Sequence, residues 1–313
     1  MPRTDRPSGA DGMTGTDLVG RTALVTGANS GLGLETARVI AARGGHVLLG
    51  CRNADRADRA QADILDSTPD ASVSVVRLDL ADLTQVREAA QLLHDTHGRL
   101  DLLIANAGVM TSARTVTADG FEADLGTNFL GHFALTGLLL DLLDAAPAAR
   151  VVTVGSVAHR FGRIRFDDPQ LAQHFSAFRA YAQSKLAQVM CFLALDRRLR
   201  ASGSRTISVG AHPGGSRTAV LRDQSAFLQW GMRRERLTRL LVQEPRLGAL
   251  PALHAATAGD VAGGDYFGPG GPLELTGPPS PARISRRARD HATQDRLWAM
   301  AEELTGVRYG RIS

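Results

Sequence analysis

Tyr181 and Lys185 stand four residues apart in a stretch with the pattern of a helix, 176–201. Side chains at positions i and i+4 of a helix lie on one face. A tyrosine phenol has a pKa of about 10 and transfers protons poorly at neutral pH, but an adjacent ammonium group favours the phenolate and lowers that pKa. The pair therefore predicts acid–base chemistry. Taken alone, it is better explained by a surface lysine beside a half-buried tyrosine.

The lysine is unusual in this chain of 313 residues. Lys185 is the only lysine among 36 basic residues, and the others are all arginine. Lysine carries a compact ammonium with three donors, whereas arginine carries a broad planar fork. Because the chain uses arginine wherever a general positive charge is enough, the exception indicates a site that needs a point charge in a tight space.

A glycine-rich segment, TGANSGLG at 26–33, follows the first expected strand and opens the first expected helix. Glycines allow a tight strand-to-helix turn and let a pyrophosphate approach the backbone, and the phosphates then lie at the helix N-terminus. The segment predicts a dinucleotide site, with an ordinary glycine turn as the other interpretation. The cofactor-binding residues expected here are Gly27, Asn29, Ser30, Gly31, Leu32 and Gly33.

Arg52 and Asn53 follow the second expected strand, and no acidic residue occurs there before Asp55. At this position a carboxylate binds the ribose 2′-hydroxyl of NAD, whereas an arginine accommodates the 2′-phosphate of NADP. We therefore expect NADP(H) to be preferred over NAD(H). The alternative is that Arg52 is an ordinary surface residue of an arginine-rich protein.

Short apolar runs alternate with amphipathic stretches from Arg21 onward. Strands are expected at 23–26, 46–50, 73–78, 100–105, 150–155 and 206–211, and helices at 31–43, 54–66, 82–97, 120–146 and 176–201. This alternation indicates βαβ units with right-handed crossovers. The expected fold is α/β: a single doubly wound Rossmann-type domain, with a parallel sheet and helices on both faces. Ser156 then lies at the carboxyl edge of the sheet, where ligands of such folds bind.

Composition limits the remaining organisation. Residues 1–17 are polar and have no apolar run, so they are expected to form a disordered tail, followed by one catalytic domain over 18–313. C-terminal additions are expected to cover the substrate, with 216–243 as a lid whose apolar residues suggest a bulky apolar molecule; core packing is the alternative. Two cysteines, Cys51 and Cys191, exclude a disulfide framework and a four-cysteine zinc site, and no metal is expected.

The residues resemble the short-chain dehydrogenase/reductase family. The motifs that carry the resemblance are TGANSGLG, Asp79-Leu80, Asn106-Ala107-Gly108, Asn128, Ser156, Tyr181-x-x-x-Lys185, and Pro213-Gly214 through Thr218, in the order of that family. The match covers 20–215 well. The segments CRN at 51–53, NFLGHFALT at 128–136 and SKLA at 184–187 are similar to the retinol dehydrogenase and protochlorophyllide reductase-like branch.

The resemblance implies a role for each matching position. Tyr181 would be the general acid, Ser156 would orient the carbonyl, and Lys185 would bind the nicotinamide ribose and lower the tyrosine pKa. Asn128 would hold a water that connects Lys185 to solvent. The remaining cofactor contacts would come from Asp79, Leu80, Asn106, Ala107, Gly108, Pro213, Gly214 and Thr218.

The expected function is an NADP(H)-dependent oxidoreductase that reduces a carbonyl or oxidises the matching alcohol of a small molecule. Reduction of a C=C bond and a non-catalytic NADPH-binding scaffold are the alternatives. Acidic residues number 32 and the basic residues contain no long block, so no nucleic-acid partner is expected, and no apolar run is long enough to be an integral membrane segment. A cytoplasmic location is expected. Homodimer, homotetramer and monomer all remain open.

Overall fold

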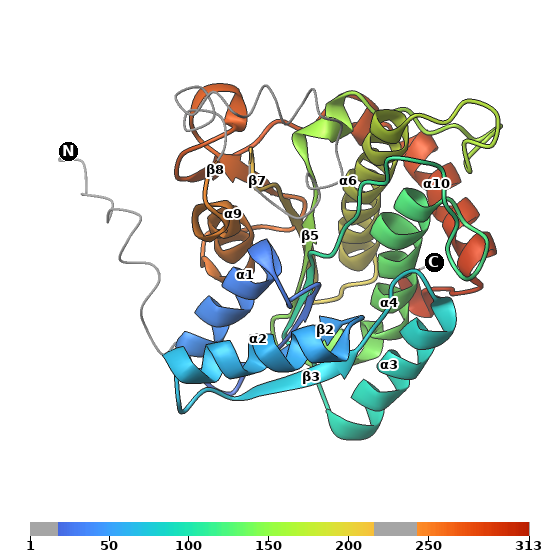
Figure 1. Cartoon of the computed structure of the whole chain (residues 1–313). Helices are drawn as coiled ribbons and strands as arrows, with labels where there is room; N and C mark the ends of the chain where they lie inside the picture. The colour runs from blue at the N-terminus through green and yellow to red at the C-terminus, as the bar shows by residue number, and fades with distance from the viewer. Residues whose placement is uncertain (1–17, 216–242, 313) are drawn as a thin grey trace.

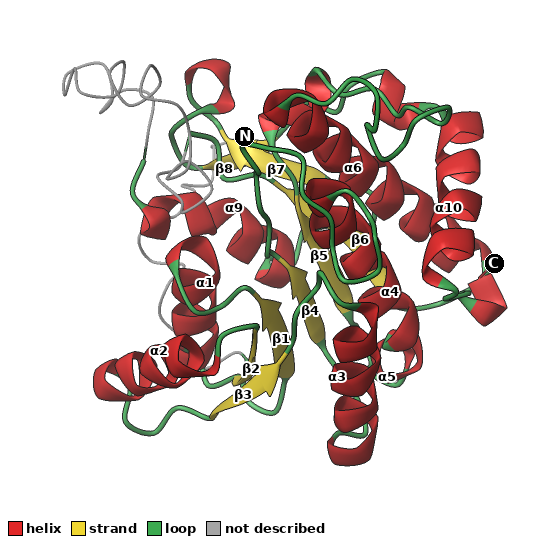
Figure 2. Ribbon diagram, turned by 45° about the vertical axis from the view of Figure 1, so that its right-hand side comes forward, coloured by secondary structure: helices red, strands yellow, loops and turns green. Residues whose placement is uncertain are grey.

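The centre of the structure is a twisted, mostly parallel sheet (Figures 1 and 2). The computed structural model describes residues 18–215 and 243–312, so the expected tail, Thr218 and all but the last residue of the expected lid lie outside the described residues. Within these ranges the strands are β1 Thr22–Thr26, β2 His46–Cys51, β3 Val73–Arg77, β4 Leu102–Ala105, β5 Arg150–Val154, β6 Ile207–Ala211, β7 Tyr266–Pro269 and β8 Pro279–Pro281. The six strands expected from the apolar runs are confirmed.

The strand order is β3-β2-β1-β4-β5-β6-β7-β8, and only the β7–β8 pair is antiparallel. The chain order reverses between β1 and β4, where Val25 of β1 pairs with Leu49 of β2 on one side and with Ile104 of β4 on the other. In open α/β sheets the ligand crevice lies outside the carboxyl ends of the strands at such a reversal. The doubly wound fold is therefore confirmed, and its crevice is located.

Helices cover both faces of this sheet (Figure 1). They are α1 Gly31–Ala42, α2 Ala54–Ser67, α3 Leu83–Thr96, α4 Gly131–Leu138, α5 Leu140–Asp144, α6 Ala177–Ala201, α9 Pro245–Thr257 and α10 His291–Thr305. Two apolar clusters separate the faces: α1, α2 and α9 share one, and α3, α4, α5, α6 and α10 share the other. Strand residues alternate between them, since Leu24 belongs to the second cluster and Ala23 and Val25 to the first.

The single helix expected over 120–146 is wrong. The segment contains a π-helical part, η2 Leu125–Leu130, followed by α4 and then α5 after a break at Leu139. The chain passes closely beneath the ring of Tyr309 here, because a Cβ atom on Gly137 would lie 2.6 Å from that ring. Tyr309, from the C-terminal part of the chain, packs on this segment. The residue pattern of 120–146 contains no sign of that contact.

The C-terminal helix α10 packs on α6, α4 and η2. Trp298 is 3% exposed, and its ring centroid lies 5.0 Å from that of Phe133 and 4.6 Å from that of Tyr309. The Arg198 guanidinium lies 4.4 Å from the centre of the same indole. Helix α10 thus covers part of the surface of α4 and α6.

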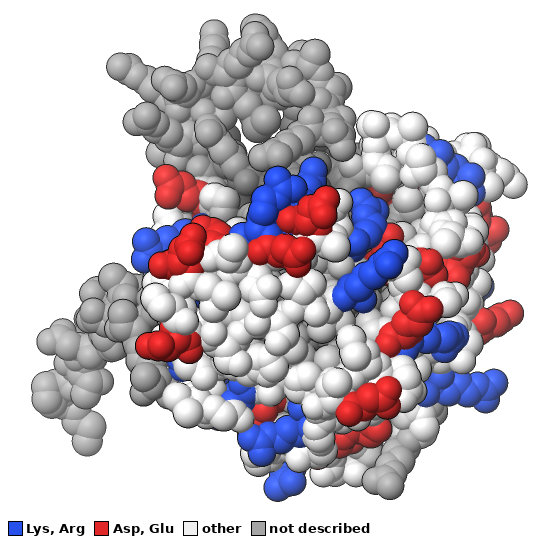
Figure 3. Space-filling view, turned by 60° about the horizontal axis from the view of Figure 1, so that its bottom comes forward, with Lys and Arg blue, Asp and Glu red and all other residues white. Residues whose placement is uncertain are grey.

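Charges are mixed on the face that Figure 3 shows. Acidic and basic side chains lie next to one another there, without a large area of one sign. Ion pairs also form among the described residues, such as that of Arg38 with Asp63 at 2.6 Å. On this face, the basic side chains do not gather into a patch of one sign.

Replacing Trp298 by alanine is expected to lower the free energy of unfolding by about 3–5 kcal/mol, because it leaves a large cavity in an aromatic cluster. Urea unfolding followed by circular dichroism measures this. Leu92→Ala is the control: this side chain is 46% exposed, and its loss should cost less than about 1 kcal/mol. Equal losses in the two variants would contradict the packing role of α10.

Candidate active site

The residues predicted for the site follow four neighbouring strands at one edge of the sheet. Gly27 follows β1, Asn106 follows β4, Ser156 follows β5, and Pro213 comes shortly after β6. Because these strands are parallel, their carboxyl ends share an edge. The topology therefore brings together segments that are far apart along the chain.

The glycine loop forms a close cradle between β1 and α1. A Cβ atom on Gly33 would lie 2.3 Å from the carbonyl oxygen of Gly27 and 2.5 Å from the Asn106 amide nitrogen. Gly27 and Gly31 have φ of +66° and +55°, the left-handed region that favours glycine. Ser30 is the N-cap of α1 and makes no side-chain capping bond. The first-turn N–H groups are thus left for an anion, as a pyrophosphate requires.

Thr26, at the end of β1, joins this loop to β4. Its hydroxyl oxygen accepts hydrogen bonds from the backbone N–H groups of Asn106 and Ala107, both at 2.9 Å. The side-chain amide of Asn106 donates in turn to the Thr26 carbonyl at 2.8 Å. Among the described residues, Asn106 and Ala107 therefore form a brace: their hydrogen bonds to Thr26 fix the end of β4 against the start of the glycine loop.

His132, on α4, extends the brace toward the centre of the site. Its Nδ1 lies 2.9 Å from the Asn128 carbonyl oxygen and must donate, so Nε2 accepts from the Thr26 hydroxyl at 2.9 Å. Complete burial lowers the pKa of His132 to about 4, which keeps the ring neutral and this tautomer in place. His132 was not predicted as a site residue. A histidine on an otherwise apolar helix was its only signal in the sequence.

Asn128 lies in η2 and is fully buried. Its two amide hydrogens go to the Val109 carbonyl and the Ser184 hydroxyl, each at 2.9 Å, and its side-chain oxygen accepts from the Val109 N–H at 2.7 Å. Both donors of the amide are thus committed to protein partners. Its side chain holds the 108–109 turn against α6.

Lys185, Tyr181 and Ser156 meet beside that turn. The Lys185 ammonium is buried and donates to the Val154 carbonyl at 3.0 Å, at the end of β5. It lies 5.7 Å from the centre of the Tyr181 ring, so the two side chains share a face of α6 as expected. The Ser156 side chain hydrogen-bonds the Tyr181 phenol. A Cβ atom on Gly108 would lie 3.5 Å from the ammonium nitrogen, so Gly108 packs directly against this group.

The expected lowering of the Tyr181 pKa is wrong for this structure. Burial raises the pKa of Tyr181 to about 12, while the hydrogen bond with Ser156 acts in the opposite direction. Burial also lowers the pKa of Lys185 to about 8, which Asp124 partly offsets. Desolvation of the phenol is therefore the largest influence on the pKa of Tyr181.

The residues after β2 lie at the outer end of the crevice. Arg52 is 72% exposed, and its Nε is 3.9 Å from the Asp79 carboxylate. Asn53 accepts a hydrogen bond from the Arg56 N–H at 2.9 Å and caps α2, and Asp79 accepts one from the Ala81 N–H at 3.0 Å. Leu80 is buried against Gly131. Arg52 and Asp79 thus lie together where the adenosine end of a dinucleotide would bind.

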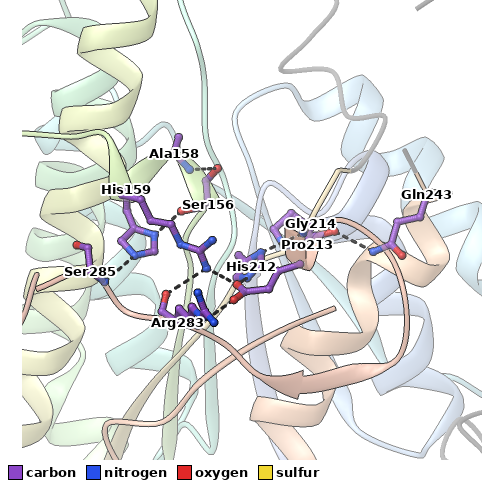
Figure 4. A network of polar contacts seen from close by, with 11 residues as sticks. Ser156, Ala158, His159, His212, Pro213, Gly214, Gln243, Arg283 and Ser285 are labelled. Atoms are coloured by element: carbon purple, nitrogen blue, oxygen red, sulfur yellow. Dashed lines mark hydrogen bonds and ion pairs between the residues drawn. The ribbon is translucent and has the colours of Figure 1, made fainter. Parts of the chain in front are cut away.

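Figure 4 shows the contacts that hold the loop after Ser156. The Ser156 hydroxyl accepts from the Ala158 N–H at 3.2 Å. His159 Nδ1 donates to the Ser156 carbonyl at 2.6 Å, and Nε2 accepts from the Ser285 N–H at 3.3 Å. Burial lowers the pKa of His159, so the neutral ring keeps both bonds.

A second histidine holds the loop after β6 (Figure 4). His212 Nδ1 accepts from the Gly214 N–H at 3.2 Å, so Nε2 donates to the Glu274 carboxylate at 3.1 Å. Gly214 has φ of +67°, and the Pro213 carbonyl accepts from the Gln243 side chain at 2.8 Å. Pro213 and Gly214 therefore lie at the carboxyl edge of the sheet, and their contact with a cofactor stays a prediction.

Three comparisons with known proteins agree with this geometry. Residues 21–228 match the family model described as short chain dehydrogenase. The chain is 40% identical to human retinol dehydrogenase 12 over 299 residues, which cover 95% of this chain and 90% of that protein.

Two solved structures extend the comparison. One is an uncharacterized protein from Mycobacterium paratuberculosis, with TM-score 0.76, 38% identity and coverage of 93% of this chain and 96% of that one. The other is an NAD(P)-dependent gluconate 5-dehydrogenase from Beutenbergia cavernae with bound NADP, with TM-score 0.63, 27% identity and coverage of 80% and 94%. Among the helices described in this chain, none is both long and apolar enough to cross a membrane.

Gly33→Ala is expected to destabilise the fold by about 1–3 kcal/mol and to weaken NADPH binding, because the added methyl group collides with the Gly27 carbonyl. Thermal unfolding with and without NADPH measures both effects. Gly98→Ala is the control, since a Cβ atom there meets no described atom within 4 Å. If Gly33→Ala kept wild-type NADPH affinity, the phosphates would have to lie elsewhere.

Proposed function

The chain belongs to the short-chain dehydrogenase/reductase family, in its retinol dehydrogenase-like branch, and on that premise we propose that it interconverts a carbonyl and an alcohol with NADP(H) as cofactor. The family consists of oxidoreductases that use nicotinamide cofactors. The observation that supports the proposal most directly is the meeting of Tyr181, Lys185 and Ser156 at the carboxyl edge, beside the glycine cradle.

The described residues fit a nicotinamide dinucleotide. The close packing of Gly33 on Gly27 and Asn106 excludes any side chain at this position, and the first-turn N–H groups of α1 favour an anion. Arg52 offers an exposed guanidinium at the end of β2, which supports NADP(H) over NAD(H). When bound, the reduced cofactor supplies the hydride.

The protein's own residues would supply orientation and proton transfer. The Ser156 hydroxyl would hold the substrate carbonyl oxygen within reach of the Tyr181 phenol. Because the pKa of Tyr181 is raised, the phenol stays protonated at neutral pH and acts as the acid in reduction. Lys185, held by the Val154 carbonyl, would keep its ammonium beside the phenol and stabilise the phenolate that forms.

The substrate class is proposed from the similar human protein. Retinol dehydrogenase 12 is named for retinol, a bulky apolar alcohol, and a molecule of that kind would suit this chain. Retinal and a series of aliphatic, aromatic and α,β-unsaturated carbonyl compounds therefore form the test panel. The unsaturated compounds distinguish C=O from C=C reduction by their products.

Tyr181→Phe is expected to lower kcat by about 10²–10⁴-fold and to leave NADPH affinity within a few-fold, because only the transferable proton is lost. NADPH consumption with the panel gives kcat, and fluorescence titration gives the affinity. Tyr266→Phe is the matched control: its buried hydroxyl has no hydrogen-bond partner among the described residues, so turnover should stay near wild type. Substantial turnover by Tyr181→Phe would remove the phenol from the mechanism. Tight NADPH binding without turnover by the wild type would favour a scaffold.

Arg52→Ala is expected to lower kcat/KM for NADPH by about tenfold and to leave that for NADH nearly unchanged, because one charge-assisted contact to the 2′-phosphate is lost. Steady-state kinetics with both cofactors measure the ratio. Arg56→Ala, another exposed arginine nearby, should not change it. An unchanged ratio in Arg52→Ala would assign the phosphate contact to another residue.

A further inference from the structure

The hairpin that joins β7 to β8 contains an unusual turn, η5 Pro272–Glu274. Leu273 and Glu274 have φ of +55° and +58°, in the left-handed region that glycine favours and other residues rarely adopt. The Leu273 side chain is 77% exposed, so burial does not stabilise this conformation. A strained backbone persists where the surrounding contacts enforce it, and such residues are concentrated at functional sites. The contacts of Glu274 are therefore the feature that needs an explanation.

The Glu274 carboxylate accepts hydrogen bonds from three different segments (Figure 4). Its Oε2 binds the Arg160 guanidinium and accepts from His212 Nε2 at 3.1 Å, and its Oε1 accepts from the Arg283 N–H at 3.3 Å. Arg160 ends the short helix η3 Val157–Arg160 after β5, His212 follows β6, and Arg283 follows β8. The His212 side chain is fully buried, and that of Glu274 is 17% exposed. These four residues form the Glu274 network.

One of the joined segments carries Ser156. Ser156 is the N-cap of η3, and Arg160 is the last residue of the same helix. Arg160 also donates to the Arg283 carbonyl at 3.4 Å. The ring of His159 donates to the Ser156 carbonyl and accepts from the Ser285 N–H. Two neighbouring side chains of η3 therefore fix the Ser156 loop to the residues after β8.

The loop after β6 is held by the same turn. Because His212 Nε2 donates to Glu274, its Nδ1 is the atom that accepts from the Gly214 N–H at 3.2 Å. The N–H of Gly215 donates to the Leu275 carbonyl at 2.9 Å, and a Cβ atom on Gly214 would lie 2.3 Å from that oxygen. The strained turn therefore packs directly on the loop after β6.

The partners of Glu274 explain why this position holds a carboxylate. Arg160, His212 and the Arg283 N–H all act as donors, and an ionised carboxylate only accepts. Burial acts to raise the pKa of Glu274, but the Arg160 charge and these hydrogen bonds lower it, so the carboxylate stays ionised. A glutamine of the same size would turn two N–H donors toward groups that themselves donate.

We propose that Glu274 is a positioning residue that joins the Ser156 loop to the loop after β6, and so sets the distance between the substrate carbonyl and the nicotinamide. The inference rests on the proposed function, in which Ser156 holds the substrate and the loop after β6 contacts the cofactor. Glu274 acts through Arg160 on the first loop and through His212 on the second. A misplacement of about 1 Å between reacting groups costs about a hundredfold in rate, so such a link matters for turnover.

Glu274→Gln tests this, because it keeps the size of the side chain and removes an acceptor. We expect kcat to fall by about 10- to 100-fold, since the two loops lose their shared anchor. The KM for NADPH should stay within about threefold, because the glycine loop and Arg52 follow other strands, β1 and β2. Glu274→Asp keeps a group that only accepts and should recover part of the loss. A lower melting temperature with an unchanged kcat per folded molecule would show a merely structural role and overturn the proposal.

Asp295→Asn is the matched control. Asp295 of α10 also joins two segments through a carboxylate, since it pairs with Arg197 and Arg198 of α6 at 2.6 and 3.1 Å. These arginines lie about three turns beyond Lys185, so kcat should stay near the wild-type value. Leu273→Ala is a control in the turn itself, because it removes an exposed side chain and keeps the carboxylate. A loss of kcat in either control as large as that of Glu274→Gln would contradict the proposal.

Amide hydrogen exchange measures the link without substrate. In Glu274→Gln, peptides containing 156–162 and 212–215 should both exchange about tenfold faster than in the wild type, because each loop loses a charge-assisted contact. A peptide containing 26–33 should not change. Wild-type exchange in both loops overturns the inference even if no panel compound is turned over. The expected exchange difference in a protein that turns over no compound counts against the proposed function alone.

Arg160→Met provides an independent variant should Glu274→Gln fold poorly. It removes the guanidinium from one of the two loops and leaves the contact between His212 and Glu274 in place. The 156–162 peptide should exchange faster than in the wild type, while the 212–215 peptide stays protected. The fall in kcat should be smaller than in Glu274→Gln. Unchanged exchange of the 156–162 peptide overturns the proposal here as well.

Discussion

Burial of one ammonium group constrains the whole candidate site. A charge removed from water must be paired or hydrogen-bonded, and Lys185 meets this requirement through the Val154 carbonyl at the end of β5. That bond joins α6 to the carboxyl edge of the sheet and so carries Tyr181 to the same edge as Ser156.

Burial also separates the protonatable groups into two kinds. His132, His159 and His212 all have lowered pKa values, so they stay neutral and serve as hydrogen-bond connectors with defined tautomers. They brace the loops after β1, β5 and β6. The groups suited to proton transfer are Tyr181 and Lys185, since burial raises the pKa of the first and lowers that of the second. Histidine, the usual acid–base residue near neutral pH, is here part of the scaffold.

The packing of α4, on one face of the sheet, depends on residues from the C-terminal part of the chain. Trp298 and Tyr309 pack around Phe133 of α4, and the Tyr309 hydroxyl donates to the Phe133 carbonyl at 2.6 Å. This packing divides the segment 120–146 into η2, α4 and α5. Helix α4, which follows Asn128, is therefore packed by residues that come more than 150 positions later in the sequence.

The sequence by itself determined the six leading strands, the doubly wound fold class and the shared edge of the glycine loop and Ser156, because strand and helix periodicity and turn chemistry are local properties. The lone lysine likewise indicated where a buried charge would lie. Only the tertiary structure decided the protonation of Tyr181, the braces at Thr26 and His132, and the carboxylate contacts of Glu274. Desolvation and hydrogen-bond pairing arise from packing between distant segments, which no local pattern records.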